Sequence, residues 1–251
     1  NPNGAVTSRM THSHPNMAQI PSSSSPYGED CRACWTVPED YRLVGIDASG
    51  LELRMLAHYL NDEGYTNEIL NGDIHTANQR LADLESRDQA KTFIYALLYG
   101  AGDAKLGSVV GRGRAHGKGL RQRFFDNLPS FKKLTDRVQR EAKSGFIKAL
   151  DGRKLTVRSE HAALNTLLQG AGAIVMKKAL IILDETIRTN NWDAKFVANV
   201  HDEWQIECHV YDAVDVGKAG VEAIIQAGIE LNLNCPLDGD YKVGENWSET
   251  H

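Results

Sequence analysis

The stretch Leu43–Leu60, with the sequence LVGIDASGLELRMLAHYL, constrains the fold of this 251-residue chain more than any other. Its first four residues form a short apolar run with β-branched members and no polar alternation, which is typical of a buried strand. The run stops at Asp47, and apolar residues then return at the spacing of a helix. A carboxylate at the end of a buried strand is costly unless a cation meets it. Taken alone, Asp47 is more simply interpreted as part of the cap of the following helix.

A second acidic site lies far downstream in Phe196–His209, with the sequence FVANVHDEWQIECH. Two strand-like runs flank Asp202 and Glu203, so the segment is predicted to form a β-hairpin with acids at its tip. Acids at a hairpin tip are usually solvated turn residues. Together with Asp47, however, they suggest carboxylates that converge on a divalent cation, because neighbouring carboxylates raise each other's pKa unless a metal supplies the opposite charge. Such oxygen ligands suit Mg²⁺, which keeps waters and binds substrate phosphates.

The third distinctive stretch is Ser86–Gly100, with the sequence SRDQAKTFIYALLYG. Ser86 followed by Gln89 forms a capping box, which predicts that a helix begins there. Basic and then aromatic residues recur at every fourth position and form a stripe along this helix, at Arg87, Lys91, Tyr95 and Tyr99. A guanidinium and an ammonium one turn apart can hold a polyphosphate, and the tyrosines can stack on a sugar or base. A solvated basic face explains one Arg and one Lys, but not two tyrosines that continue the same stripe.

The charges are distributed unevenly along the chain. The net charge of −5 argues weakly against a nucleic-acid partner. Residues 105–158, however, carry 15 basic and 4 acidic side chains between two acidic flanks. This pattern fits a segment that faces phosphates beside one that faces metals, although a solvated basic surface without a partner stays open.

Two further classes of protein are disfavoured by the sequence. Cys31 and Cys34 form a lone CxxC without a second ligand pair, so we expect packing thiols rather than a zinc site or a disulfide framework. No run of 18 apolar residues and no signal-peptide pattern is present. We therefore expect a soluble, non-exported protein that does not bind a membrane.

The remaining sequence predicts a series of shorter elements. We expect an irregular N-terminal segment with short strands over 1–38, a polar connection over 61–76, a helix over 75–84, short helices over 103–144, a hairpin over 145–158, a long helix over 161–189, a helix over 212–228, and a final strand with a docked tail over 237–247.

The three distinctive stretches resemble motifs A, B and C of family A (DNA polymerase I-type) DNA polymerases. The matching segments are DASGLELR, the RxxxKxxxYxxxYG helix and the VHDE hairpin. The chain is most similar to the replicative polymerases of short-tailed phages, and the likeness extends from the opening NPNGAVTSRMTH through NGDIHT and LDGRKLTVRSEHAALNTLLQGAGA to His251. Three motifs in the right order argue strongly against a chance match.

The resemblance implies an α+β fold with two subdomains. One is a polymerase palm, an antiparallel sheet with packed helices, and the other is a mostly helical fingers subdomain. We expect the first part of the palm with motif A over 1–60, the fingers with the motif B helix 86–100 over 61–158, and the second part of the palm with the motif C hairpin 196–209 over 159–251. We expect this chain to contain only palm and fingers, without the thumb and exonuclease domains of the family.

The resemblance also implies roles for individual residues. Asp47 and Asp202 are the expected catalytic metal ligands, together with the carbonyl of Ala48, and Glu203 is expected to support the hairpin or its metals from behind. Lys91 is the third expected catalytic residue, because it can protonate the pyrophosphate. The residues expected to bind the incoming nucleotide are His75, Arg87, Lys91, Tyr95, Glu52 and Tyr99. Those expected to bind DNA are Arg9, Asn165, Gln169 and His201.

The implied activity is template-directed DNA synthesis in phage DNA replication, by two-metal nucleotidyl transfer from a dNTP to a primer 3′-hydroxyl. The expected cofactors are two Mg²⁺ ions, for which Mn²⁺ can substitute. The expected partners are primer–template DNA, dNTPs, the thumb and exonuclease domains and a processivity factor, in the host-cell cytoplasm.

Three alternatives stay open. A single-subunit RNA polymerase has a similar palm, but Glu52, with Tyr99 packed against it, is the bulky acid expected beneath the sugar 2′ position in DNA-making enzymes. In a two-metal nuclease, the basic and aromatic helix 86–100 would have no role. A fragment without its thumb can bind DNA and yet be inactive.

Overall fold

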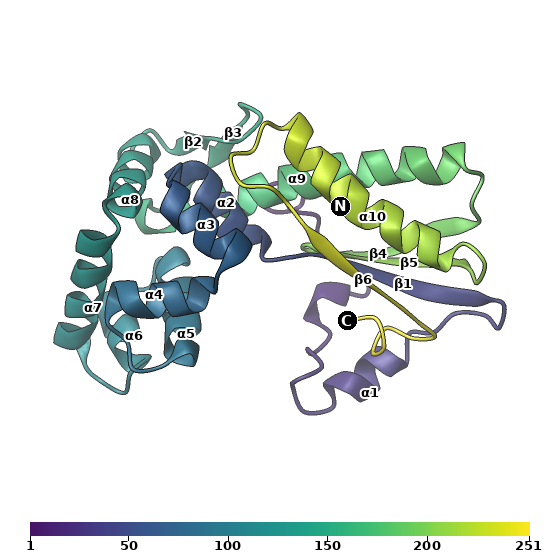
Figure 1. Cartoon of the computed structure of the whole chain (residues 1–251), viewed down its shortest axis with the longest axis horizontal. Coiled ribbons are helices and arrows are strands. Elements are labelled where there is room, and N and C mark those ends of the chain that lie inside the picture. The colour runs from purple at the N-terminus through teal and green to yellow at the C-terminus, as the bar shows by residue number, and fades with distance from the viewer. The chain divides into compact units, whose positions relative to one another are not determined.

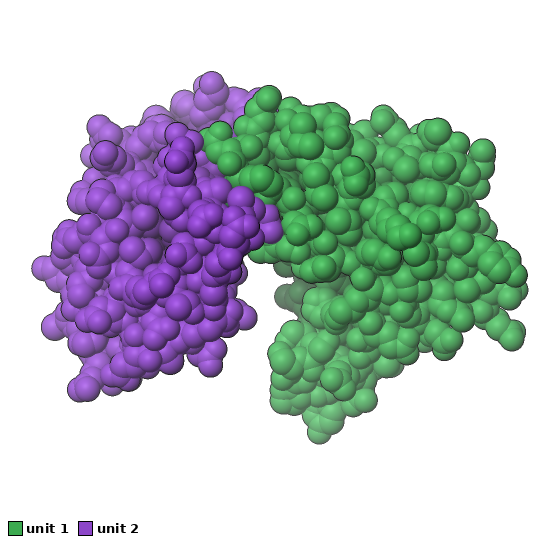
Figure 2. All heavy atoms as spheres, in the orientation of Figure 1, with its two compact units in different colours: residues 1–51, 170–251 green, residues 52–169 purple.

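The structure is a computed structural model that describes residues 1–251. Contacts divide the chain into two compact units, residues 1–51 with 170–251 and residues 52–169, coloured separately in Figure 2. These limits differ from the expected palm and fingers boundaries at residues 60 and 158. The contact limits fall at the start of α2 (Leu51–Leu60) and inside α9 (Ala163–Thr189). A helix that continues through a boundary hides it, because its hydrophobic spacing does not change there.

The first unit is built on an antiparallel four-stranded sheet with the order β4-β5-β1-β6. Its strands are β1 (Tyr41–Ala48), β4 (Ala194–Val200), β5 (Glu203–His209) and β6 (Gly239–Gly244). The central strand β1 pairs with β5 on one side and β6 on the other. The predicted strand, the predicted hairpin and the antiparallel α+β architecture are therefore confirmed.

Helix α10 (Ala213–Glu230) covers one face of this sheet, where it contacts β6, β1 and β5 (Figure 1). A Cβ at Gly220 would collide with the side chain of Ile46, so the absence of a side chain lets α10 lie close to β1. Ile46 is fully buried. Burying such a side chain stabilises a fold by roughly 1.5–3 kcal/mol.

The long helix α9 is joined to α10 by an ion pair of 2.5 Å between Lys178 Nζ and Glu230 Oε2. Residues Glu160–Thr189 are long and apolar enough by composition to cross a membrane, but 67% of the most apolar window is buried inside the protein. Burial of this kind is typical of a core helix.

The opposite face of the sheet carries residues 17–33 and the C-terminal tail (Figure 1), whereas the start of the chain reaches α9, where Lys177 Nζ donates to Asn3 Oδ1. The expectation of short strands over 1–38 is wrong. The segment forms η1 (Met17–Gln19) and α1 (Gly28–Ala33), and its only bridge joins Thr36 to Asn246. The acids Glu29 and Asp30 in the first turn favour the helix, which is too short to show a hydrophobic period.

The second unit is mostly helical. Besides most of α2 and the start of α9, it contains α3 (Glu63–Asn71), α4 (Ile74–Ala82), α5 (Arg87–Leu98), α6 (Asp103–Ser108), α7 (Arg114–Asn127), α8 (Pro129–Ala142), the hairpin β2 (Phe146–Lys148) and β3 (Lys154–Thr156), and η2 (Glu160–Ala162). Phe93, Phe124 and Phe131 form an aromatic core with ring centroids 5.7 and 5.2 Å apart. Edge-to-face pairs at such separations are favourable.

Helix α3 corrects the prediction of a polar connection over 61–76. Asp62 caps this helix by accepting a hydrogen bond of 3.0 Å from the Tyr65 N–H. Tyr65 is the only buried residue of α3. The helix therefore lacks the apolar stripe from which a helix is predicted.

Candidate functional site

Acidic residues lie in one row across the sheet of the first unit. Asp47 of β1 is directly opposite Glu203 of β5 and Asp240 of β6. Residues directly opposite each other in antiparallel strands project to the same face. Asp202 adjoins this row, because the Ala48 N–H donates to its carbonyl oxygen at 3.1 Å. The structure thus brings the predicted residues together and adds Asp240, which lies in no recognised motif.

The crowding of acids appears in the pKa of Asp47. Its side chain is exposed, yet nearby protein atoms desolvate the carboxyl and raise its pKa, and the charges of Asp202 and Glu203 bring it to about 7. An excess of negative charge of this kind is what a divalent cation would offset. Carboxylate and backbone carbonyl oxygens are suitable ligands for Mg²⁺. No group of three or more His, Cys, Asp or Glu side chains is placed to hold a metal ion by itself.

This raised pKa predicts a pH-dependent effect of Asp47→Asn on folding in the absence of metal. A carboxyl with a folded-state pKa above its unfolded value contributes stability below about pH 4 and loses it as the pH rises through about 7. Asp47→Asn should therefore stabilise the protein at pH 8 and have little effect at pH 4. Because the side chain is exposed, the gain should not exceed about 1 kcal/mol. Urea unfolding with chelator at both pH values measures it, and an equal effect at both would contradict the assignment.

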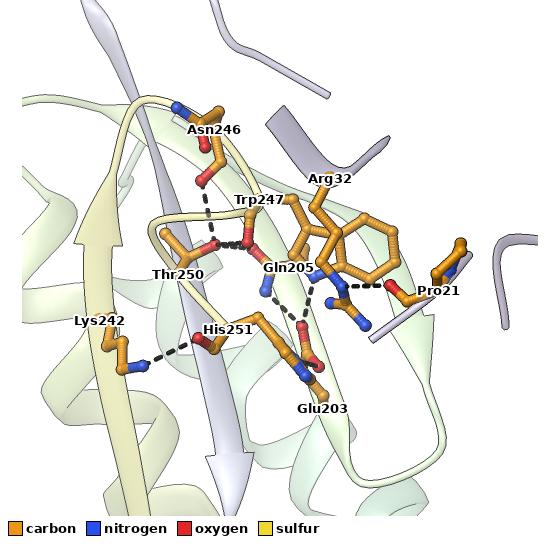
Figure 3. Close-up of polar contacts among 9 residues, drawn as sticks. All are labelled: Pro21, Arg32, Glu203, Gln205, Lys242, Asn246, Trp247, Thr250 and His251. Carbon is orange, nitrogen blue, oxygen red and sulfur yellow. Dashed lines mark hydrogen bonds and ion pairs between the residues drawn. The ribbon is translucent and has the colours of Figure 1, made fainter. Parts of the chain in front are cut away.

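Within the acidic row, Glu203 is buried, with only 4% of its surface exposed. Its carboxylate accepts hydrogen bonds from Trp247 Nε1 at 2.7 Å and Gln205 Nε2 at 2.5 Å, and His251 Nδ1 lies 2.5 Å from it (Figure 3). Burial acts to raise the pKa of Glu203, but these partners outweigh it and lower the pKa below its usual value. Glu203 is therefore a fixed anion within β5, and not the hairpin-tip residue that the sequence suggested.

The C-terminal tail is docked, as predicted, and further contacts hold it on the sheet. Thr250 Oγ1 donates to Gln205 Oε1 at 2.8 Å, and Lys242 Nζ donates to the carbonyl of His251 at 2.9 Å (Figure 3). The Arg32 guanidinium lies 4.5 Å from the centre of the Trp247 ring. The sequence did not reveal these partners, because more than 40 positions separate Trp247 and Thr250 from the strand that they contact.

Gly45 is needed for this docking. A Cβ there would collide with the Thr250 carbonyl and lie 2.7 Å from Gln205 Nε2. Gly45→Ala should destabilise the protein by about 1–3 kcal/mol, because the tail must move. The matched control is Gly64→Ala in α3, where an added Cβ meets only Asp62 Oδ1 at 3.5 Å. Urea unfolding compares the two, and an equal free energy of unfolding for both variants would contradict close docking.

In the second unit, the predicted stripe lies on α5 and is joined by His75 from α4. Ser86 caps α5 by accepting from the Gln89 N–H at 3.2 Å, as expected, although the Gln89 side chain accepts from Glu85 rather than Ser86. The ring centroids of His75 and Tyr95 are 6.3 Å apart. Burial lowers the pKa of His75, and the nearby positive charges of Arg87 and Lys91 lower it further.

The two residues expected to select the sugar are in direct contact. The Tyr99 hydroxyl donates to Glu52 Oε2 at 3.0 Å, which fixes the acid at the start of α2 against the end of α5. Lys91 is exposed on the same helix. The sequence missed Asp73, which forms an ion pair of 2.6 Å with Arg87.

The residues expected to bind DNA fall in two places. Arg9 and His201 line a small depression in the first unit with Lys177 and Met176, and His201 has a positive φ of 60° in the hairpin turn. Asn165 and Gln169 are half-buried and one turn apart on α9.

Comparisons with known proteins agree with this geometry. The model of DNA polymerase family A matches residues 1–249. A DNA-directed DNA polymerase of Enterobacteria phage T3 is 46% identical and one of Escherichia phage T7 is 45% identical, each over 100% of this chain. The chain spans about two-fifths of the length of these curated relatives, 40% of each.

A solved structure supports the same assignment. The polymerase domain of Pol1 from M. smegmatis, in complex with DNA primer-template and dNTP, superposes with a TM-score of 0.90 at 25% identity. The match covers 99% of this chain and 47% of the other. The chain belongs to DNA polymerase family A.

Proposed function

We propose that this chain carries out template-directed DNA synthesis, adding a deoxynucleotide to a primer 3′-hydroxyl. The observation that carries the proposal is the pairing of β1 with the hairpin strand β5, which puts Asp47 and Ala48 beside Asp202 in a family A chain. Family A DNA polymerases generally use divalent metal ions, and we propose Mg²⁺, with Mn²⁺ as a substitute.

In this proposal the acids of the first unit hold two cations. Asp47, Asp202 and the carbonyl of Ala48 are the ligands, and Glu203 keeps the hairpin in place from its buried site. When bound, divalent ions supply Lewis acidity to the attacking hydroxyl and to the leaving phosphate oxygens. These residues would orient the hydroxyl and phosphate oxygens, and the pairing of β1 with β5 keeps Asp47 and Asp202 close together.

The residues of α4 and α5 would bind the incoming nucleotide. Arg87, Lys91 and His75 offer positive charge and hydrogen-bond donors to its phosphates, which stabilises charge as it develops. Lys91 would donate a proton to the departing pyrophosphate. Tyr95 would lie against the sugar, and the Tyr99–Glu52 pair would exclude a 2′-hydroxyl.

DNA would be held by several sets of donors. Arg9, Asn165, Gln169 and His201 are proposed to contact the primer–template, where minor-groove contacts check shape rather than sequence. The basic segment 105–158, which forms α6 to α8 and the following hairpin, would attract the phosphate backbone. We further propose that the chain works in the host cytoplasm, with thumb and exonuclease domains and a processivity factor.

Sugar selection tests DNA synthesis against RNA synthesis. Glu52→Ala should increase ribonucleotide incorporation relative to deoxynucleotide by roughly tenfold or more, because the volume that excludes the 2′-hydroxyl is removed. The matched control is Glu63→Ala, which removes an acid from the first turn of α3. Competition of dNTP and rNTP on one primer gives the ratio. A wild type that prefers ribonucleotides would favour an RNA polymerase, and an unchanged ratio in Glu52→Ala would remove Glu52 from this role.

A further inference from the structure

Asp73 joins two of the proposed phosphate-binding elements. It is the N-cap of α4, where its Oδ1 accepts from the N–H groups of His75 at 3.0 Å and Thr76 at 3.4 Å. Its Oδ2 accepts from Thr76 Oγ1 at 2.9 Å and from Arg87 Nε at 2.6 Å. Four donors therefore fix this carboxylate, and they come from the start of α4 and the start of α5.

The contact with Arg87 engages only one edge of the guanidinium. The hydrogen bond runs from Nε, and the side chain of Arg87 is 52% exposed. An arginine has five N–H donors in a planar fork, so the bond to Asp73 leaves the two terminal nitrogens for an oxyanion. An arginine held in this way has lost its rotamer freedom before a ligand arrives, which lowers the entropy cost of binding.

The surrounding charges fit this arrangement. The positive charges of Arg87 and Lys91 both act on the His75 ring, so the start of α4 and the N-terminal half of α5 bring these three groups near one another. The hydrogen bond from Arg87 is the main reason that the pKa of Asp73 lies well below its usual range. Asp73 thus stays an anion throughout the neutral range.

We propose that Asp73 is a positioning residue for the triphosphate, holding Arg87 through Nε so that its terminal nitrogens, with His75 and Lys91, bind the outer phosphates. The proposal rests on the proposed function. The direction of the change in phosphate affinity identifies this role. Removing a negative charge near an anion site would by itself tighten phosphate binding. Loss of a positioning contact weakens it instead.

The test measures binding of inorganic tripolyphosphate and of a dNTP to the whole chain by calorimetry in the absence of metal. Asp73→Asn retains a good N-cap residue but loses the ion pair, so α4 should persist. We expect tripolyphosphate to bind about 3–10-fold more weakly, with primer–template affinity unchanged. The control is Asp62→Asn, which alters another helix N-cap whose remaining oxygen accepts from Ser130 rather than from an arginine. It should leave both affinities unchanged.

A double-mutant cycle with Arg87→Ala separates positioning from structural damage. Adding Asp73→Asn to Arg87→Ala should cause no further loss of tripolyphosphate affinity, because the residue to be positioned is gone. Tighter or unchanged binding by Asp73→Asn, a full additional loss in the Arg87→Ala background, or no binding by the wild type would overturn the proposal.

The outcomes also separate this proposal from the proposed function. If Asp73→Asn binds tripolyphosphate more weakly but the wild-type chain does not extend primers, the proposed phosphate site is supported and the proposed polymerase activity is contradicted. If the wild type extends primers but Asp73→Asn binds tripolyphosphate as tightly as the wild type does, only the positioning role of Asp73 is contradicted.

Discussion

Asp202→Asn and Asp47→Asn are each expected to lower the rate of nucleotide incorporation by roughly 10³-fold or more. Each removes one of two carboxylates that the strand register brings together, and a neutral amide is a poor ligand for a hard cation. Several kcal/mol of transition-state stabilisation depend on such cations, and each 1.36 kcal/mol is a factor of ten in rate. Single-turnover extension of a labelled primer in Mg²⁺ measures the change.

Two controls make this result specific. Asp215→Asn replaces an exposed acid in the first turn of α10 and should leave the rate unchanged. Primer–template affinity should survive in both variants, because the proposed phosphate contacts elsewhere on the chain would supply most of it. A near-normal rate for either active-site variant would show that the metal ligands lie elsewhere.

Tyr95→Phe is expected to make the chain reject dideoxynucleotides 10- to 100-fold more strongly than the wild type, which is expected to accept them readily. A normal nucleotide has a 3′-hydroxyl that can hydrogen-bond to its own phosphate, and a dideoxynucleotide leaves that space empty. The Tyr95 hydroxyl can supply the missing donor, whereas Phe cannot. A hydrogen bond to a charged group contributes about 1.5–3 kcal/mol, which is roughly one to two decades in selectivity.

Competition between a dideoxynucleotide and its deoxynucleotide on one primer measures this selectivity. Tyr99→Phe is the matched control on the same stripe, because its hydroxyl contacts Glu52 and should affect the 2′ position instead. Strong discrimination by the wild type, or no difference between wild type and Tyr95→Phe, would mean that α5 does not lie over the sugar.

The parts of the fold encoded locally were predictable from the sequence. An apolar run that ends at Asp47 predicts β1, two runs around an acidic turn predict the hairpin, and a capping box predicts α5, since each signal spans only a few residues. The contact of Tyr99 with Glu52 followed from the family resemblance rather than from any spacing.

Other parts depend on contacts between distant segments. Asp240 enters the acidic row through the register of β6 with β1, and a shift by one residue would turn it to the other face. The partners of Glu203 come from the last residues of the chain. Asp73 looks like an ordinary helix cap until α4 and α5 are packed together. Contacts between distant segments of this kind leave no local pattern in the sequence from which they could be predicted.

Addition of one nucleotide to a primer is the decisive measurement of template-directed DNA synthesis by this chain. The 251-residue chain is mixed with a primer–template whose next template base is varied in turn, and each dNTP is offered alone in Mg²⁺ and in chelator. We expect only the complementary dNTP to be added in each case, and no addition in chelator. A folded chain that binds the primer–template but adds nothing in Mg²⁺, or that adds nucleotides regardless of the template base, would rule out template-directed DNA synthesis by this chain.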